Sequence, residues 1–390
     1  MSESTAPDDV FGVYLHVPFC ATRCGYCDFN TYTPGEVGAG ASQGDYLDAI
    51  SRELELAVAA HPELQRSADT IFIGGGTPSL LGAHGLSRLL DGVRNTFGIS
   101  ANAEITTESN PESTSPEFFD GLLEAGFTRV SLGMQSAVPQ VLATLDRTHT
   151  PGRPAAAVAE ARAAGFRHLN LDIIYGTPGE SMADLDETLA AVLATEVDHV
   201  SAYSLIVEPG TAMARKVRRG ELAMPDDDDL ADRYERIDRA LSSAGFDWYE
   251  VSNWSRPGGQ CRHNMLYWRD GNWWGAGPGA HSHLGDSRFF NVKHPARYAA
   301  VVSNGQLPVH DSEALSPHDR HVEAIMLGLR LSEGIAADIL QPAEREAAQA
   351  QVAAGMLEFV PAATPAGAQR LRLSERGRLL ADAIIVDILS

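Results

Sequence analysis

The sequence predicts an α/β fold: a partial, TIM-like (β/α)6 barrel, followed by a C-terminal extension and a small helical, winged-helix-like domain. Short apolar runs alternate with helix-like segments six times before residue 210, and such alternation is typical of parallel strands joined by crossover helices. Glycine, proline and polar residues gather directly after the strands, at the end that forms the active face of a β/α barrel. Six units instead of eight indicate an open side with room for a large substrate.

The six expected strands are short and apolar, and they cover residues 13–19, 70–73, 104–107, 129–132, 169–174 and 199–207. The helices expected between them carry apolar side chains at helical spacing and cover residues 46–60, 86–96, 116–125, 154–164 and 185–193. A further helix is expected at residues 230–244, because the acidic run Asp226–Asp229 before it suits the positive end of a helix dipole.

The pattern changes after residue 245. All five tryptophans lie within Trp248–Trp274, which indicates an aromatic-rich extension over residues 246–310. Residues 311–390 are expected to form a small domain, in which 370–377 and the apolar segment that follows are typical of a wing and a terminal helix. The chain is therefore predicted to divide into a disordered N-terminus (1–10), the barrel (11–245), the extension (246–310) and the C-terminal domain (311–390).

Composition excludes several classes of protein. The formal charge is −22, from 30 basic and 52 acidic side chains, which argues against general nucleic-acid binding through phosphate contacts. No stretch of about 18 apolar residues is present, so no transmembrane segment is expected. The acidic N-terminus has no apolar core and resembles neither a signal nor a transit peptide. With only four cysteines, the chain is predicted to be cytoplasmic rather than a secreted disulfide scaffold.

Three of the four cysteines are clustered near the start, as Cys20, Cys24 and Cys27, with Tyr26 directly before the last. Three thiolates can bind three irons of a cubane cluster and leave the fourth iron open to a small molecule. A disulfide would leave one thiol over, and a structural zinc site normally needs four protein ligands. The spacing therefore predicts a [4Fe–4S] cluster on these three residues.

The Cys-x3-Cys-x2-Cys spacing resembles the signature of the radical S-adenosylmethionine (SAM) superfamily, in which the amine and carboxylate of SAM chelate the open iron. The order of the strand-end motifs further resembles the anaerobic coproporphyrinogen III oxidase-like family and, within it, the haem chaperone (HemW) subfamily. The matching motifs are Tyr14-x-His16-x-Pro18-Phe19-Cys20, Gly74-Gly75-Gly76-Thr77-Pro78-Ser79, Glu108-x-Asn110-Pro111, Gly133-Met134-Gln135-Ser136, Arg147-x-His149, Asp172-Ile173-Ile174-Tyr175-Gly176 and His263-Asn264-x-x-Tyr267-Trp268.

This resemblance implies a SAM site at the strand ends, made by Tyr14, Tyr26, Gly75, Gly76, Thr77, Glu108, Gln135, Arg147, Asp172 and Ile206. Glycines let the backbone approach a ligand closely, because no Cβ intervenes. Arg147 suits a carboxylate, and Asp172 can accept hydrogen bonds from hydroxyl groups. Taken singly, each polar residue is more often a surface or capping residue, and the glycine run could be a structural turn.

Two departures favour the chaperone branch, which implies a protein that binds haem and passes it to acceptor apoproteins. The oxidases carry a further cysteine where this chain has Phe29, and they have a longer segment than the 19 residues before Cys20. The motif that begins at His263 marks the chaperone branch, so His263 is the predicted haem ligand. His281, His283 and Cys261 are its competitors, and a buried aromatic packing unit is the alternative for the whole stretch.

Two other functions stay open from the sequence. The first is an oxygen-independent coproporphyrinogen III oxidase, in which SAM cleavage would give a radical that attacks a substrate propionate and leads to decarboxylation. The second is a transcriptional regulator that uses a SAM or redox sensor together with the terminal wing, although the acidic charge disfavours it. An electron donor is a further expected partner of the cluster.

Overall fold

The structure is a computed structural model that describes residues 10–37, 42–147, 149–361 and 369–390. The predicted disordered N-terminus, apart from residue 10, lies outside the described residues. Within the described residues, no helix is both long enough and apolar enough to span a bilayer.

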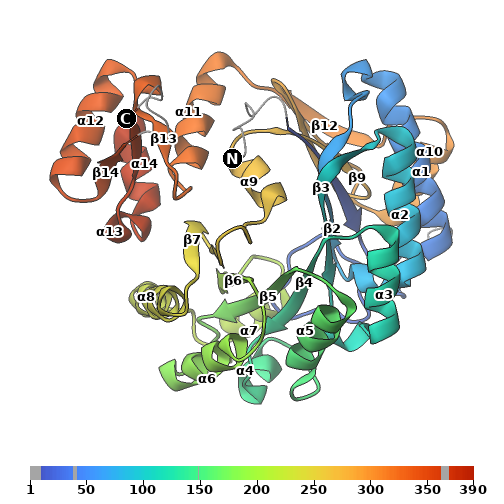
Figure 1. Cartoon of the computed structure of the whole chain (residues 1–390), viewed down its shortest axis with the longest axis horizontal. Helices are drawn as coiled ribbons and strands as arrows, with labels where there is room; N and C mark the ends of the chain where they lie inside the picture. The colour runs from blue at the N-terminus through green and yellow to red at the C-terminus, as the bar shows by residue number, and fades with distance from the viewer. Residues whose placement is uncertain (1–9, 38–41, 148, 362–368) are drawn as a thin grey trace.

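Six parallel strands form the centre of the molecule and confirm the predicted partial barrel (Figure 1). They are β1 (Phe11–Val17), β2 (Ala68–Gly75), β3 (Ile99–Ser109), β4 (Arg129–Gln135), β5 (His168–Tyr175) and β6 (His199–Ser204). β1 begins and ends two residues earlier than expected. It ends before Pro18, since proline has no N–H to continue the ladder.

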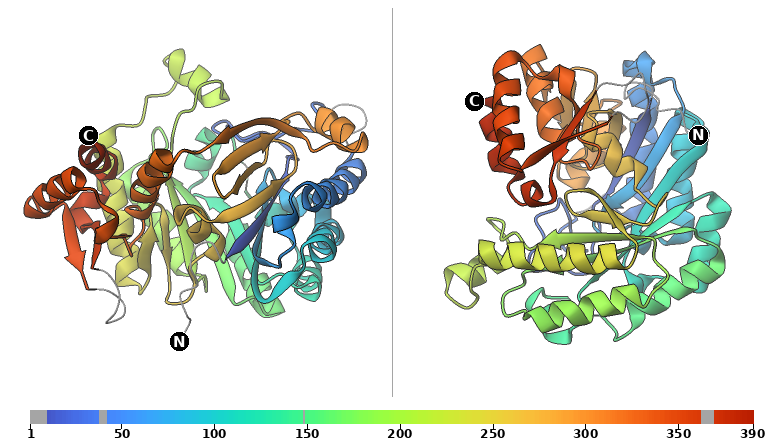
Figure 2. Two further views of the ribbon diagram at one scale, coloured as in Figure 1. Left: turned by 90° about the horizontal axis from the view of Figure 1, so that it is seen from above. Right: turned by 60° about the vertical axis from the view of Figure 1, so that its left-hand side comes forward.

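Helices cover the convex face of the curved sheet, as Figures 1 and 2 show. The main ones are α1 (Gln43–Ala60), α2 (Gly82–Thr96), α3 (Pro116–Ala125), α5 (Arg153–Ala164), α6 (Met182–Leu193) and α8 (Asp227–Ser243). Shorter elements are α4 (Pro139–Thr144), α7 (Ala212–Arg218) and the 3-10 turns η2 (Pro62–Leu64), η3 (Pro78–Leu81) and η4 (Pro111–Ser113). The acidic run does cap α8, because the side chain of Asp226 accepts a hydrogen bond from the Asp229 amide.

The aromatic-rich extension lengthens the same sheet at both edges, which the sequence did not predict. β8 (Asn253–Ser255) pairs antiparallel with β6 and with β7 (Asp247–Glu250). At the other edge, β9 (Asn272–Ala276) pairs parallel with β1 and is followed by three antiparallel strands and a helix. These are β10 (His281–Leu284), β11 (Ser287–Asn291), α10 (Pro295–Ser303) and β12 (Val309–Ala314). The result is one sheet of twelve strands.

Helix α9 (Arg262–Trp268) lies on the concave side of this sheet, where it contacts β2 (Figure 1). A full barrel would be closed by its own strands at this side. Here a short helix from the extension covers part of the open side and brings the residues of the His263 motif into the barrel interior.

The C-terminal part has a small sheet and a core of its own, formed by buried side chains between Ile325 and Ile388. Its elements are α11 (Pro317–Gly328), β13 (Ile335–Ala336), η5 (Ala337–Ile339), α12 (Pro342–Ala353), β14 (Leu357–Val360), β15 (Arg370–Leu373), α13 (Glu375–Arg378) and α14 (Ala381–Leu389). An ion pair between Arg378 and Asp238, at 3.1 Å, joins it to α8. β12 spans the boundary predicted between residues 310 and 311, and it belongs to the large sheet.

Candidate functional site

The loop after β1 carries the three clustered cysteines and is fixed by backbone hydrogen bonds at several points. The amide of Cys20 donates to the carbonyl of Tyr32 at 3.1 Å, and the amide of Gly25 donates to the carbonyl of Leu145 at 3.2 Å. Helix α7 adds a further contact, because the Met213 amide donates to the Gly25 carbonyl at 2.8 Å. All three cysteines are free and only partly buried. Their thiols are thus available at a defined place at the carboxyl end of the sheet.

The thiols sit beside polar groups that suit a metal-bound thiolate. Burial raises the pKa of Cys20, and it raises the pKa of Cys27 to about 11. The Thr77 hydroxyl lies 3.8 Å from the Sγ atom of Cys20, and the Arg147 guanidinium lies 3.3 Å from the Sγ atom of Cys24. Both can donate to a sulfur that carries negative charge. Metal coordination would remove the thiol protons that burial otherwise retains.

The described His, Cys, Asp and Glu side chains do not converge in threes on a single metal-ion position. A cubane cluster does not need such a point, since its cysteines bind separate irons. The backbone beside the loop supports the fit. A Cβ atom on Gly76 would lie 2.5 Å from the Phe19 carbonyl oxygen and 3.0 Å from the Cys20 Sγ atom. Only glycine allows this approach, so the residue after β2 must be small for the chain to pack against the cysteine loop.

Glu108, at the end of β3, lies next to the glycine run. Its Oε2 atom accepts a hydrogen bond from the Gly75 amide at 2.9 Å. Burial raises the pKa of Glu108 to about 8, and the negative charge of Asp172 raises it further, while the Gly75 hydrogen bond opposes the shift. The carboxyl group therefore holds a proton at neutral pH and can donate as well as accept a hydrogen bond.

Arg147, Gln135 and His149 form a compact group beside Cys24. The Arg147 guanidinium donates twice to the Gln135 Oε1 atom, at 2.7 and 3.1 Å, and His149 lies 3.1 Å from the same oxygen. Gln135 has a φ of 60°, a left-handed conformation that is unfavourable for this residue type. Such strain is found where a functional site requires one side-chain direction.

Asp172 belongs to a chain of hydrogen bonds inside the barrel. It accepts from Ser131 at 2.8 Å and from Asn170 at 2.7 Å. Asn170 also contacts His199 at 2.7 Å. These residues line a cavity of about 200 Å³ that Tyr14, Glu108 and α9 also border. Carboxyl, amide and hydroxyl groups line this cavity, so it can take up hydroxyl and amine groups of a ligand that enters from the strand ends.

The remaining predicted SAM residues lie in three different settings. Tyr14 is partly buried, and its hydroxyl lies 3.0 Å from the Nδ1 atom of His16. Tyr26 packs against a small apolar cluster that includes Val138 and Leu205. Ile206 follows β6 and leaves 64% of its surface exposed. The structure therefore brings Glu108, Asp172 and Tyr14 to one cavity, whereas Ile206 does not line it.

His263, the predicted haem ligand, is completely buried, with both ring nitrogens already hydrogen-bonded. Its Nδ1 atom lies 2.8 Å from the Thr70 hydroxyl, and its Nε2 atom lies 2.8 Å from the Tyr267 hydroxyl. Burial lowers the pKa of His263 to about 3. Iron coordination by His263 would require one of these hydrogen bonds to break. The role of His263 as haem ligand therefore stays a prediction.

Cys261 lies apart from the cysteine loop, at the start of α9. Its side chain is buried and its Sγ atom lies 3.5 Å from Glu104, which in turn pairs with Arg129. Arg129 also donates to the carbonyls of Gly259 and Gln260. This buried pair anchors the chain that leads into α9, and Cys261 packs as part of it.

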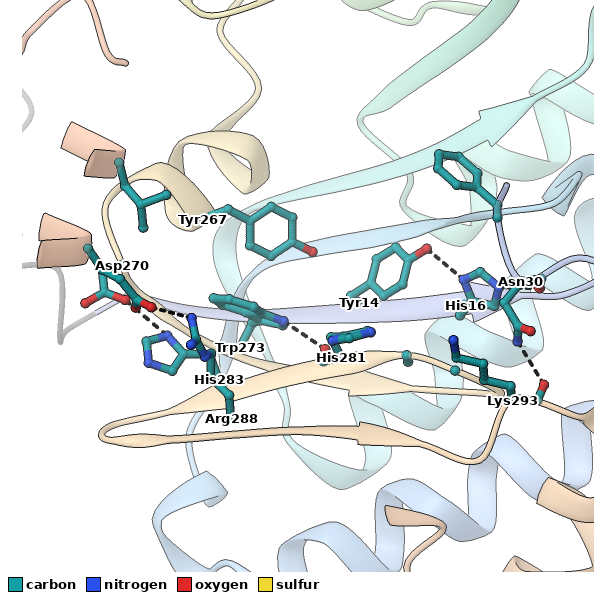
Figure 3. Close-up of a pocket in the computed structure, with 15 residues that line it drawn as sticks. Tyr14, His16, Asn30, Tyr267, Asp270, Trp273, His281, His283, Arg288 and Lys293 are labelled. Carbon is teal, nitrogen blue, oxygen red and sulfur yellow. Dashed lines mark hydrogen bonds and ion pairs between the residues drawn. The ribbon is translucent and has the colours of Figure 1, made fainter. Parts of the chain in front are cut away.

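A larger cavity, of about 570 Å³, lies between the cysteine loop, α9 and strands β9 to β11 (Figure 3). Its walls are aromatic and carry charges of both signs: Arg288 and Lys293 are cationic, and Asp270 and Glu323 are acidic. Tyr267, Trp273, His281 and His283 are among the other lining residues that Figure 3 labels. Phe29, from the end of the cysteine loop, also borders it. Tyr14 and Tyr267 border both cavities, so the two are neighbours.

Sequence reasoning missed two residues that hold the extension in place: Asn30, which borders this cavity, and Glu53, which is buried behind it. Asn30 ties the cysteine loop to the extension, because its amide donates to the carbonyls of Pro278 and Lys293, each at 2.8 Å. Glu53 on α1 is fully buried and accepts from the Gly277 amide at 2.8 Å. No local pattern marks these residues, since each acts on a segment more than 200 positions away.

The chain is similar to known proteins in sequence and in fold. Residues 14–192 match the Radical SAM superfamily. A protein of Mycobacterium tuberculosis described as heme chaperone HemW is 57% identical over 98% of this chain and 96% of its own length. A HemW protein of Bacillus subtilis is 32% identical, over 83% of this chain and 84% of its own length. The structure of coproporphyrinogen III oxidase (HemN) from Escherichia coli shares the fold, with a TM-score of 0.81 at 22% identity over 99% of this chain and 91% of that one.

Proposed function

Because this chain belongs to the radical SAM superfamily and, within it, to the HemW family, we propose that it is a haem chaperone that binds haem and passes it to acceptor apoproteins. The observation that carries this proposal is the cavity of about 570 Å³ beside the cysteine loop. Its volume falls within the range of roughly 300–1,000 Å³ that is usual for ligand pockets. Aromatic walls, histidines and cationic side chains suit a large flat ligand that carries iron and carboxylates.

The cofactors that we propose are a [4Fe–4S] cluster and SAM. Cys20, Cys24 and Cys27 would hold the cluster, which supplies a redox centre with one iron left for SAM. Gly76 keeps the backbone close to the Cys20 sulfur, and Arg147 places a positive charge beside the Cys24 sulfur. Two observations therefore support a cluster at this loop: the three cysteines are free, and Gly76 leaves open the space beside Cys20 that a Cβ atom would fill.

The proposed SAM site uses the polar strand ends. Arg147 already binds the Gln135 side-chain oxygen through two donors, and the same geometry suits a carboxylate. Glu108 holds a proton at neutral pH, so it can donate one hydrogen bond to a ligand while it accepts the Gly75 amide. Asp172 accepts hydrogen bonds within the smaller cavity. Tyr14, Tyr26, Gly75, Thr77 and Ile206 complete the set of residues that we propose for SAM.

We further propose a cytoplasmic protein that acts with an electron donor and with haem-acceptor apoproteins. The oxidase reaction is the competing function. Phe29 weighs against it, because its apolar side chain is 62% exposed and borders the large cavity where the oxidases carry a thiol.

The deciding experiment is anaerobic reconstitution followed by two separate assays on the same preparation. Titration with ferric haem should give saturable binding of about one haem per chain with a shifted Soret band. Incubation with coproporphyrinogen III, SAM and a strong reductant should give no decarboxylation above that of a cluster-free Cys24→Ala control. Decarboxylation of coproporphyrinogen III without haem binding would favour the oxidase function over the chaperone function.

A further inference from the structure

Three histidines line the large cavity, and their ring nitrogens differ in availability. His16 contacts the Tyr14 hydroxyl and the Asn30 carbonyl, each at 3.0 Å. His283 contacts the Gly271 carbonyl at 3.1 Å and Arg320 at 3.4 Å, and it is 1% exposed. Among the described residues, neither ring nitrogen of His281 has a hydrogen-bond partner. His281 is therefore the one histidine of this cavity that can offer a nitrogen without breaking an existing contact.

The position of His281 is well defined although its side chain is exposed. It begins β10, and its ring stacks on Phe290 of β11 with centroids 5.2 Å apart and planes inclined by 20°. Its carbonyl accepts a hydrogen bond from the Trp273 indole at 2.9 Å. Figure 3 shows the imidazole of His281 between Trp273 and Lys293, on the side of the cavity that faces Tyr14. A side chain fixed in this way loses little freedom when it binds a ligand.

Cations of the cavity also differ in availability. Arg288 is held by two carboxylates, Glu313 at 2.9 Å and Glu323 at 2.6 Å. Lys293 is exposed, and its ammonium group has no ion pair within the described part of the chain. It lies near His281 in the cavity wall. Lys293 can therefore accept a carboxylate from a ligand in the cavity without giving up a partner.

We propose that His281 is an axial ligand of haem iron in the large cavity, and that Lys293 binds a haem propionate. This inference rests on the proposed chaperone function and names the residues that hold its cargo. The indole of Trp273 and the phenol of Tyr267 border the same space from β9 and α9 and can cover the porphyrin plane. Burial, and then the charge of Lys293, lower the pKa of His281, which favours the neutral imidazole that ligates iron.

The first test compares ferric haem with iron-free protoporphyrin IX on the full-length, reconstituted protein. His281→Ala should shift the Soret band and weaken haem binding roughly tenfold or more, while protoporphyrin binding stays within about twofold of wild type. The loss then depends on the iron rather than on the shape of the pocket. His84→Ala is the matched control, because His84 is an exposed histidine on α2, away from the cavity. It should leave both affinities and the spectrum unchanged.

The second test uses haem dimethyl ester, which lacks free propionates. Wild-type protein should bind the ester roughly fivefold more weakly than haem, since an exposed ion pair contributes about 1 kcal/mol at most. Lys293→Gln should bind haem with this reduced affinity and show no further loss with the ester. An equal penalty for the ester in wild type and in Lys293→Gln would overturn the role of Lys293.

The outcomes separate this inference from the function on which it rests. Stoichiometric haem binding by wild type, with an unchanged spectrum and affinity in His281→Ala, overturns the ligand assignment and leaves the chaperone function standing. If His263→Ala instead loses the wild-type Soret band while retaining its melting temperature, His263 is the ligand and our assignment is wrong. Absence of saturable haem binding by wild type overturns both.

Discussion

Replacing Gly76 with alanine adds one methyl group where the chain after β2 presses against the cysteine loop. The new Cβ would lie 2.5 Å from the carbonyl oxygen of Phe19, 2.9 Å from the carbonyl carbon of Phe19 and 3.0 Å from the Cys20 Sγ atom. The same carbonyl accepts a hydrogen bond from the Thr77 amide at 2.7 Å. Because the nearest atoms are backbone atoms, they cannot rotate away as a flexible side chain would. The segment that carries Cys20 must therefore move.

Overpacking of this kind typically costs about 1–3 kcal/mol, and we expect Gly76→Ala to lose stability in that range. A displaced Cys20 should also bind its iron poorly, so iron and acid-labile sulfide should fall well below about four of each per chain. Both quantities can be measured on one anaerobically reconstituted sample, with iron and sulfide assays alongside thermal unfolding.

Gly35→Ala is the matched control for this experiment. A Cβ atom on Gly35 would meet nothing within 4 Å, and Gly35 has no positive φ, although it lies in the turn that follows the same loop. This variant should reconstitute like wild type. A Gly76→Ala protein with wild-type iron content and wild-type melting temperature would refute the reasoning, and so would equal losses in the two variants.

Three further predictions concern ionisable side chains. Arg147→Ala should weaken SAM binding roughly tenfold in equilibrium dialysis, because a bidentate donor is lost. The variant should retain most of its iron, since arginine does not bind the cluster. Unchanged SAM affinity would contradict the proposed site. Glu53→Ala should lower the free energy of unfolding by about 3 kcal/mol or more, because buried donors lose their acceptor. Glu53→Gln should give a smaller loss than Glu53→Ala. Denaturant unfolding measures both, and a loss below about 1 kcal/mol in Glu53→Ala would contradict this prediction. The pKa of Glu108 rises from 4.5 to about 8 on folding, so its contribution to stability is lost as pH rises through that window. Glu108→Gln should flatten the fall of melting temperature with pH, and an unchanged pH profile would argue against the buried proton.

Much of the barrel could be predicted from the sequence because its signals are local. The alternation of apolar runs and helical segments gave the order of β1 to β6, and α3 has the predicted bounds at Pro116–Ala125. The acidic run is explained by the start of α8, with Asp226 as the N-cap and the other three aspartates in the first turn. The polar residues after the strands converge because parallel strands bring their carboxyl ends to one edge.

The edges of the sheet could not be predicted, because their pairing depends on contacts between distant segments. β9 pairs with β1 across more than 250 positions, and no turn signal links the two. The hydrogen-bond partners of His263 could not be predicted either. Its motif drew attention to a histidine among aromatics, but only the fold shows that Thr70 and Tyr267 occupy both ring nitrogens. Lys293 carries no motif, and its position in the cavity follows from the strands around it.

The central claim is that the loop after β1, and not the buried Cys261, holds an iron–sulfur cluster. The most direct measurement is the iron and acid-labile sulfide content of four single variants, Cys20→Ala, Cys24→Ala, Cys27→Ala and Cys261→Ala, after anaerobic reconstitution. Each of the first three should lose the cluster, whereas Cys261→Ala should retain about four irons per chain. Wild-type iron in any loop variant, or loss of the cluster in Cys261→Ala at an unchanged melting temperature, would contradict the account.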